Sequence, residues 1–473
     1  MKKCTIMFLC LAVLFISTVC PGVYGQGTDA ELKRKVDKME KMLMELKGQL
    51  KQQAEATDEL QAMKEEIKKI SAPEAPANDF YWAQKAQELE DKGLAPAFGK
   101  QYGKPFLRRF GRNTYIGGYM DHELEFDENG GHTFDQHRLI PFIYSDVSDR
   151  VKFATEIEIE HGGPQSPGGA QDRTEAKGDI KVEFATIDFL MTDWLNYRGG
   201  IILSPLGKYN LVHDSPLQDL TDRPMVSTRI IPTTLAESGM GFFGTFYPTE
   251  LSKLDYEIYA VNGFSMEEDG TFTGSGISFI RNGRGNNQSN NNRNFALLGR
   301  LAYSPFLGLE VGLSAHTGYI DEHASNRMTI KAVDWTYQRG AFEFVGEYAH
   351  SSIERDGKHF DGRDNSNVYN GDMWGFYAEP RYHFMPQFLK DHAPTFFTEN
   401  STFTAVCRIG HLDINNPTPG SADRRQTRLT PGFNFRYTED TVFKAEYQFN
   451  WENDRTRSET SNNSLVFSVA TYF

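Results

Sequence analysis

Charged side chains at alternating positions are the residues of this sequence that could most clearly interact with a solute. Basic residues stand at the polar positions of four consecutive alternating segments: Arg381, Arg408, Arg428, Arg436 and Lys444. Acidic residues stand at such positions in other segments: Glu123, Glu125, Glu156, Glu158, Glu160, Asp255, Glu257, Glu343 and Glu347. A third group, with both signs, lies between residues 204 and 238: Lys208, Asp214, Asp219, Asp222, Arg223, Arg229 and Glu237. Opposite charges that face a water-filled space attract and orient dissolved solutes without covalent chemistry.

The sequence gives less support for covalent catalysis or for a metal site. His122, His132, His137 and His161 gather near one expected rim but lack the spacing of metal ligands, so we expect scattered imidazoles and no metal. No serine and histidine occupy adjacent outward positions, as a hydrolase on the outer wall would need. The haem motif Cys-x-x-Cys-His does not occur. We therefore predict a protein that is not an enzyme and has no cofactor of its own.

The amino-terminal residues have the pattern of a secretory signal. Lys2 and Lys3 precede an apolar run over 6–19, and small residues precede an expected cut after Gly25. Residues 1–25 are therefore predicted to be a signal peptide. Three of the four cysteines lie within it, so the mature chain keeps only Cys407, which we expect to be a small packing residue.

A heptad pattern follows the signal. Apolar positions recur at spacings of four and three from Leu32 to Leu50, and the phase continues to Leu60 before it shifts by three residues. Residues 28–70 hold ten Lys or Arg and ten Asp or Glu, with one glycine and no proline. We predict a periplasmic α-helical coiled coil over 26–70, then a linker with one short helix over 71–110. The whole chain has a formal charge of −14, and the signal carries +2, so −16 falls on residues 71–473; this acidic part disfavours nucleic acid as a partner.

Residues 111–473 alternate with a period of two, which indicates half-exposed β-strands. Leu254, Tyr256, Ile258 and Ala260, for example, alternate with Asp255 and Glu257. Sixteen segments fit: 112–126, 135–145, 150–161, 178–190, 196–203, 239–247, 251–263, 294–303, 307–319, 327–338, 340–350, 372–385, 399–411, 427–437, 441–451 and 463–473. The second and tenth alternate poorly, so a count differing by two stays open.

The links between these segments run long, short, long, short. Long links include 127–134, 162–177 and 204–238, whereas short ones include 146–149 and 248–250. Residues 386–398 are the one long link on the short side. A soluble sandwich gives no reason for this asymmetry, but an outer-membrane barrel has short periplasmic turns and long outer loops. The all-β part is therefore predicted to be a sixteen-stranded antiparallel transmembrane β-barrel, preceded by the coiled coil.

A pore follows from that architecture. Strands span lipid only as a closed barrel, because every backbone amide must be paired there. At sixteen strands the interior is too wide for side chains to fill, and water remains.

Three stretches support a family resemblance: 153–162 (FATEIEIEHG), 197–207 (YRGGIILSPLG), and 229–234 (RIIPTT) with 239–241 (GMG). They resemble the phosphate-selective porin O/P family of Gram-negative bacteria over most of 105–473. The resemblance implies a homotrimer of sixteen-stranded barrels in the outer membrane, with a periplasmic coiled coil. The acidic balance departs from the basic lumen that phosphate selectivity requires.

The expected function is passive diffusion of small polar or charged solutes. We expect the longest link, 204–238, to fold inward as a constriction, and the charged residues above to line the lumen with a mild cation preference. A phosphate or anion channel, a tether from the membrane to the cell wall through the coiled coil, and a sheath around a periplasmic redox protein stay open. Lipid is an expected partner, and Phe473, in the aromatic ending Tyr472-Phe473, resembles the signal for the barrel-assembly machinery.

Overall fold

The computed structural model describes the chain from Arg108 onward, with gaps. The described residues are 108–110, 113–128, 131–163, 178–265, 279–285, 287, 294–322, 324, 326–355, 372–414, 424–454 and 462–473. The chain divides into two compact units, Met1–Asp79 and Phe80–Phe473, and every described residue belongs to the second. The predicted signal peptide, coiled coil and linker up to residue 107 lie outside the described residues.

The described part holds one strand of three residues, β1, followed by sixteen longer strands, β2–β17. They are β1 (Arg108–Phe110), β2 (Thr114–Asp127), β3 (His132–Asp146), β4 (Val151–Glu160), β5 (Asp179–Leu190), β6 (Asn196–Leu203), β7 (Ala236–Thr249), β8 (Ser252–Val261), β9 (Ala296–Phe306), β10 (Leu309–Tyr319), β11 (Asn326–Arg339), β12 (Phe342–Arg355), β13 (Met373–Phe384), β14 (Thr402–Ile414), β15 (Arg424–Thr438), β16 (Thr441–Asp454) and β17 (Ser464–Tyr472). Each predicted segment corresponds to one of β2–β17, including β3 and β11, whose alternation is poor. The predicted count of sixteen is confirmed.

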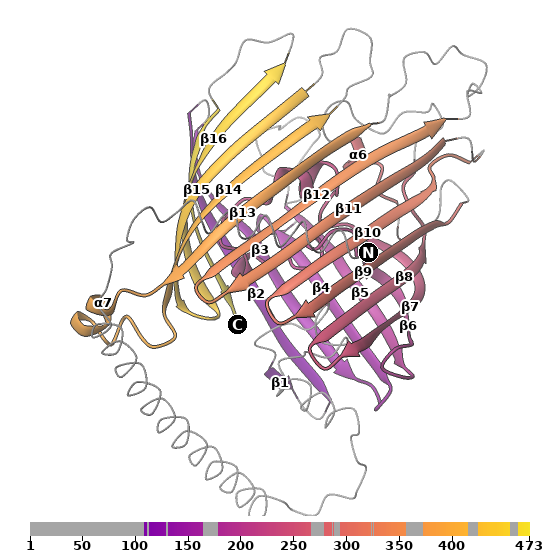
Figure 1. Cartoon of the computed structure of the whole chain (residues 1–473), viewed down its shortest axis with the longest axis horizontal. Helices are drawn as coiled ribbons and strands as arrows, with labels where there is room; N and C mark the ends of the chain where they lie inside the picture. Colours follow the sequence, from indigo (N-terminus) through magenta and orange to yellow (C-terminus); the bar gives the residue numbers. More distant parts are fainter. Residues whose placement is uncertain are drawn as a thin grey trace, which may run out of the picture. The chain divides into compact units, whose positions relative to one another are not determined.

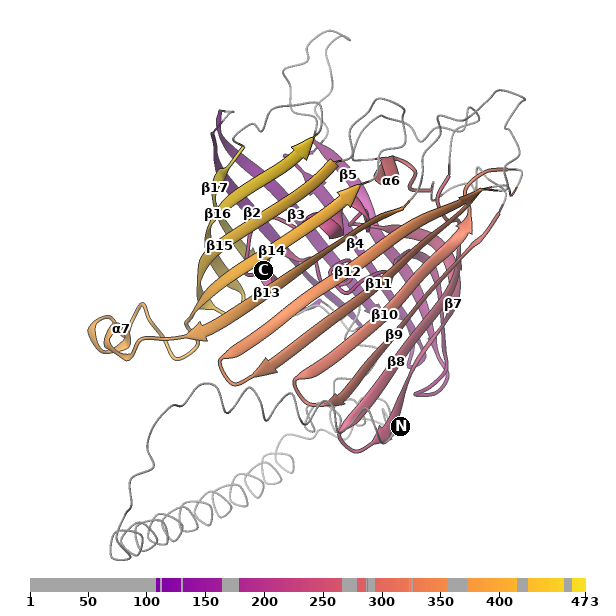
Figure 2. The same cartoon turned by 45° about the horizontal axis from the view of Figure 1, so that its top comes forward.

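The sixteen strands close into a ring (Figures 1 and 2). Each strand from β2 to β17 pairs antiparallel with its neighbour in sequence, and β17 pairs with β2, from Ser464 opposite Asp127 to Tyr472 opposite Tyr119. The short β1 pairs with β2 at Thr114–Ile116, beyond the end of this seam. Closure leaves no unpaired sheet edge along the seam.

The two faces of the barrel wall differ in the way that the alternation predicts. On β9, Leu297 and Leu301 are half exposed on the outer face, whereas Leu298 between them is fully buried. On β8, Ile258 is 45% exposed and the neighbouring Glu257 is 3% exposed. Large apolar side chains outside and charged ones inside are the reverse of a soluble protein, and are typical of a barrel surrounded by lipid. Among the described residues, no helix is long and apolar enough to cross a membrane.

The links keep the predicted asymmetry. Tight turns join β3 to β4, β7 to β8 and β15 to β16 at one end of the barrel, and the strand ends that the long links connect lie at the other end (Figure 1). The exception on the short side, between β13 and β14, holds the helix α7 (Gln387–His392). One predicted long link, 127–134, is wrong: β2 continues to Asp127 and β3 begins at His132, so the link is short.

Candidate functional site

The link between β6 and β7, residues 204–235, fills much of the barrel interior. It contains a 3-10 helix, η1 (Ser215–Leu217), and a short helix, α5 (Met225–Arg229). Most of its residues are buried, which a link between neighbouring strands achieves only by entering the barrel (Figure 2). Gly207 has φ +69°, and a Cβ there would lie 2.5 Å from Glu347 on β12, so glycine lets this segment approach the wall. We call residues 204–235 the inner loop.

Carboxylates of the inner loop bind arginines of the wall. The Asp219 carboxylate lies 3.3 Å from Arg381 Nε and 3.0 Å from Arg436 Nη2, and its Oδ1 accepts a hydrogen bond from Asn434. Burial alone would raise the pKa of Asp219, but these two guanidinium groups outweigh it and hold the pKa at about 2. Asp222 accepts a hydrogen bond of 2.9 Å from Arg428. Both loop acids are therefore anchors.

Carboxylates of the wall in turn accept hydrogen bonds from the loop. Glu347 accepts from the Tyr209 amide at 3.1 Å and from the Ser227 hydroxyl at 2.8 Å. Glu446 accepts from the backbone amide of Thr221. These bonds satisfy loop amides that have no partner in regular secondary structure.

The remaining basic residues of the wall donate to loop carbonyls. Lys444 Nζ donates to Ser215 O at 2.8 Å, Arg436 Nη1 to Pro216 O at 2.6 Å, and Arg408 Nη1 to Asp222 O. The sequence places these cations correctly on the inner face of β13–β16. They do not stand free as one basic wall, because their donor groups hold the inner loop.

An apolar contact fixes the other flank of the inner loop. Val226, Ile230 and Ile231 are fully buried in one apolar cluster with inward side chains of β8, β9 and β11–β14. That wall surface contains Val261 on β8, Leu298 on β9, Ile330 and Ala332 on β11, and Ala349 on β12. Sequence alternation does not predict this apolar patch inside the barrel.

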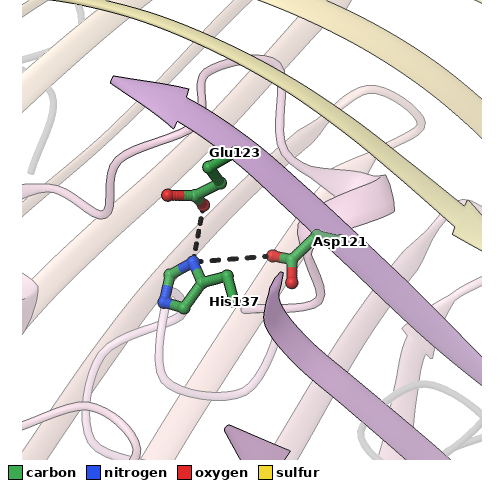
Figure 3. Close-up of side chains that lie close together, drawn as sticks. All are labelled: Asp121, Glu123 and His137. Atoms are coloured by element: carbon green, nitrogen blue, oxygen red, sulfur yellow. Dashed lines mark hydrogen bonds and ion pairs between the residues drawn. The ribbon is translucent and has the colours of Figure 1, made fainter. Parts of the chain in front are cut away.

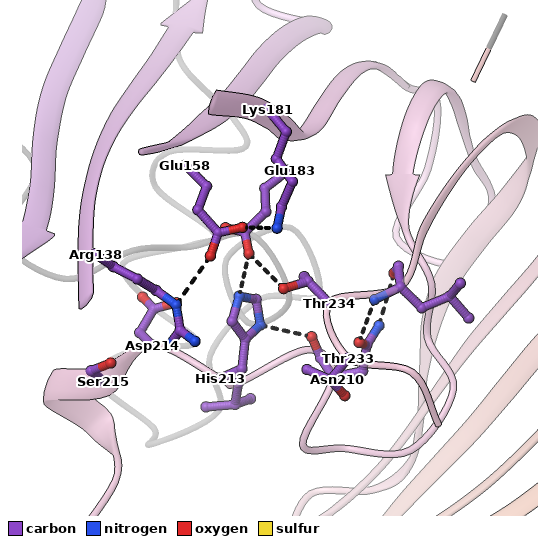
Figure 4. Close-up of polar contacts among 12 residues, drawn as sticks. Arg138, Glu158, Lys181, Glu183, Asn210, His213, Asp214, Ser215, Thr233 and Thr234 are labelled. Carbon is purple, nitrogen blue, oxygen red and sulfur yellow. Dashed lines mark hydrogen bonds and ion pairs between the residues drawn. The ribbon is translucent and has the colours of Figure 1, made fainter. Parts of the chain in front are cut away.

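A polar cluster ties the inner loop to β3–β5 (Figure 4). His213 Nε2 lies 3.0 Å from Glu183 on β5, and Thr234 Oγ1 donates to the same carboxylate at 2.8 Å. The Asn210 side chain donates to Ser204 O and Leu235 O, so it clamps the two ends of the loop together. Sequence reasoning missed Asn210, His213 and Thr234, and also Glu183, because uncharged or singly placed polar side chains give no pattern.

The other predicted residues are engaged in pairs around the interior. Lys208 lies 3.0 Å from Glu310, and Glu237 lies 3.1 Å from His316. Tyr472 donates to Asp214 at 2.8 Å. Four other carboxylates have these partners: Glu158 with Arg138 and Lys181, Glu257 with Arg198 and Tyr259, Asp255 with Lys253 and Thr245, and Glu343 with Arg381 and His383. Glu156 is fully buried, opposite Phe142 of β3 in the strand register.

Two groups bring a histidine next to two carboxylates. In the first, His137 Nδ1 lies 2.5 Å from Glu123 and 3.8 Å from Asp121 (Figure 3). Arg138 donates a hydrogen bond to the other ring nitrogen of His137 at 2.9 Å. The positive charge of Arg138 beside the ring opposes the binding of a metal ion there. In the second group, Asp219, Glu343 and His383, Arg381 forms ion pairs with both carboxylates. His137 and His161 also stack at 6.0 Å, so the expectation of scattered imidazoles is wrong for this pair.

A cavity of about 410 Å³ remains between the inner loop and the wall of β3, β15 and β16. Five arginines line it, Arg138, Arg223, Arg229, Arg281 and Arg428, against two carboxylates, Asp222 and Glu452. Arg281 belongs to the short helix α6 (Phe279–Asn282) in the next long link. Sequence reasoning missed Arg281, because the polar link around it resembled an exposed tip. The only local signal was the apolar pair Phe279-Ile280 beside it.

No family model matches the chain. An uncharacterized protein of Aquifex aeolicus is 31% identical over 311 residues, which cover 63% of this chain and 66% of that protein. The chain therefore spans slightly less than two thirds of this relative.

A solved porin structure has the same fold. OmpF of Salmonella typhi, in complex with daunomycin, is 11% identical with a TM-score of 0.50, over 78% of this chain and 100% of that one. An anion-selective porin of Comamonas acidovorans (11% identical, 76% and 99% covered) and the channel DcaP of Acinetobacter baumannii (10%, 77% and 99%) both have TM-scores of 0.47. At these identities the OmpF likeness concerns the fold alone.

Proposed function

We propose that the protein is an outer-membrane porin, through which small polar or charged solutes diffuse passively. The observation that carries this proposal is a closed sixteen-stranded barrel with large apolar side chains outside and charged side chains inside. Such a cylinder is stable in lipid and too wide for side chains from its wall alone to fill. The inner loop narrows it, so solutes pass along the side that holds the arginine-lined cavity.

The test is reconstitution of the purified protein in planar lipid bilayers. We expect stepwise ion currents and exclusion of neutral sugars above a small size limit. A protein that is soluble without detergent and gives no current would overturn the proposal. The predicted homotrimer is tested on the same sample by its mass in detergent.

The cavity favours the anion-preferring alternative over the cation preference expected from the overall charge. Net charge counts every residue, whereas an ion that passes through the cavity meets its lining, where arginines outnumber carboxylates five to two. Under a potassium chloride gradient, we expect a reversal potential of the sign that chloride permeation gives. The opposite sign would restore the cation preference.

The predicted coiled coil supplies a separate proposal, attachment to the cell wall or to a periplasmic protein. Deleting 28–70 would test it. Conductance that persists while envelope attachment fails is the expected result.

A further inference from the structure

Three guanidinium groups meet at the inner loop without a carboxylate among them. Arg223 Nη1 and Arg281 Nη1 both donate to Thr233 O, at 3.3 and 2.6 Å, and Arg284 Nη1 donates to Thr234 O at 2.9 Å. No carboxylate of a described residue forms an ion pair or hydrogen bond with any of the three. The Nε and Nη2 atoms of Arg223 are buried and have no partner in the described part of the chain. These two atoms form one edge of the guanidinium plane, the edge that binds an anion through two parallel hydrogen bonds.

Burial and the charges of neighbouring arginines lower the pKa of two arginines in the cavity. Burial, followed by the charges of Arg284 and Arg223, lowers the pKa of Arg281 to about 10. Burial also lowers the pKa of Arg229, with Arg428 as the next cause. Two arginine pairs, Arg223 with Arg281 and Arg229 with Arg428, line one cavity, and the Asp222 carboxylate already lies 2.9 Å from Arg428. A bound anion between Arg223 and Arg281 would remove the repulsion of these two groups.

The size and lining of the cavity limit the ligand. Its volume of about 410 Å³ falls within the range of roughly 300–1,000 Å³ typical of small-molecule sites. One water molecule occupies about 30 Å³ in the liquid, so the cavity is more than ten times larger and holds more than an inorganic ion would fill. Met225 lines the same cavity and offers an apolar surface beside the arginines. A short carbon chain with an acidic group at each end matches this arrangement.

We infer that the cavity is a binding site for a small organic dianion of the dicarboxylate class. One carboxylate is held by Arg223 and Arg281 and the other by Arg229 and Arg428, with the carbon chain against Met225. This inference rests on the proposed porin function and specifies the solute of that pore. The site slows the solute without trapping it, because conduction requires weak binding that permits release.

The experiment measures the single-channel potassium chloride current of the full chain with succinate or glutarate added. Acetate, which carries one carboxylate, and inorganic phosphate are the comparison probes. We expect succinate and glutarate to reduce the current at concentrations where acetate and phosphate do not. In the double variant Arg223→Gln/Arg281→Gln, the half-blocking concentration should rise at least roughly tenfold, because two charge-assisted contacts are lost.

The controls separate binding from folding. Arg428→Gln removes a charge of the opposite pair and should also weaken the block. Because Arg428 also binds Asp222 of the inner loop, the conductance of this variant without added solute is recorded as the measure of loop attachment. Arg327→Gln removes an exposed arginine of β11 outside the cavity and should leave it unchanged. Ordinary conductance with no dicarboxylate block, or equal block by phosphate, overturns this inference and leaves the porin function standing. No conductance at all overturns the porin function instead.

Discussion

The two flanks of the inner loop are held to the barrel by different physics. On one side, Val226, Ile230 and Ile231 pack in an apolar cluster with side chains of β8, β9 and β11–β14, and no solvent reaches them. On the other side, Asp219 and Asp222 bind arginines, and wall side chains of β14–β16 bind loop amides and carbonyls. Apolar contact is non-directional and closes space, whereas paired charges need fixed geometry and leave gaps between them. The cavity lies on the charged side for that reason.

Asp219→Ala should have the largest effect on this comparison. The substitution leaves Arg436 and Asn434 without their shared carboxylate inside the barrel. Breaking a buried ion pair from one side costs about 3–5 kcal/mol. We expect the charged flank to detach and the single-channel conductance to rise. Asp149→Ala, at an exposed carboxylate in a tight turn, is the matched control, and equal conductance in both variants would show that Asp219 is not an anchor.

Ile230→Ala tests the apolar flank. The side chain is fully buried, and removal of such a group costs about 2–5 kcal/mol. Since the charged anchors stay, we expect a lower unfolding temperature in detergent with a smaller rise in conductance than for Asp219→Ala. Ile187→Ala, which truncates an outward side chain that is 56% exposed, is the control for loss of the same atoms. A larger rise in conductance for Ile230→Ala would reverse the ranking of the two flanks.

Acid should release the charged flank alone. The pKa of Asp219 is about 2 with the loop in place, against 3.8 for an ordinary aspartate. Because the folded pKa is the lower one, ionised Asp219 stabilises the loop fully above that ordinary value, and this contribution is lost as the pH falls toward 2. Conductance should therefore stay constant from pH 7 to about 4 and rise below. Asp219→Asn should abolish the step, and a step that survives in that variant would assign it to another group.

Arg428→Gln should have the smallest effect, on selectivity. This side chain is 25% exposed in the cavity, and one partly hydrated charge contributes about 1 kcal/mol or less at short range. We expect the anion-to-cation permeability ratio, measured by reversal potential, to fall by a few-fold at most. Lys331→Gln, an exposed charge on β11, should leave the ratio unchanged, and a fall of the same size there would mean that cavity charges do not set selectivity.

The strands could be predicted because their signals are local. Alternation along ten residues and turn residues at fixed intervals locate β2–β17 without knowledge of their neighbours. The inward course of 204–235 also follows from its length and from its place among the long links. The sequence could not indicate which charges meet, because Asp219 and Arg436 are far apart in the chain and their contact depends on the closed register of the ring. The basic residues of β13–β16 were correctly located, yet their role as loop anchors depends on that same closure.

The interior apolar patch and the α6 arginines were missed for related reasons. Leu298 and Ile330 stand at positions that alternation assigns to the wet face, and only the packing of Val226 and Ile230 makes them buried. Arg281 lies in a polar link whose composition is that of an exposed tip. Its cavity position depends on two long links that meet inside the barrel.

The seam between β2 and β17 also determines the order of events in biogenesis. The barrel has two open edges until the residues around Tyr472 are available to meet Tyr119. Open edges recruit strands from other chains, and contacts this distant in sequence form slowly. All sixteen long strands must therefore be present, and the chain must remain shielded from its own copies, before the cylinder can seal.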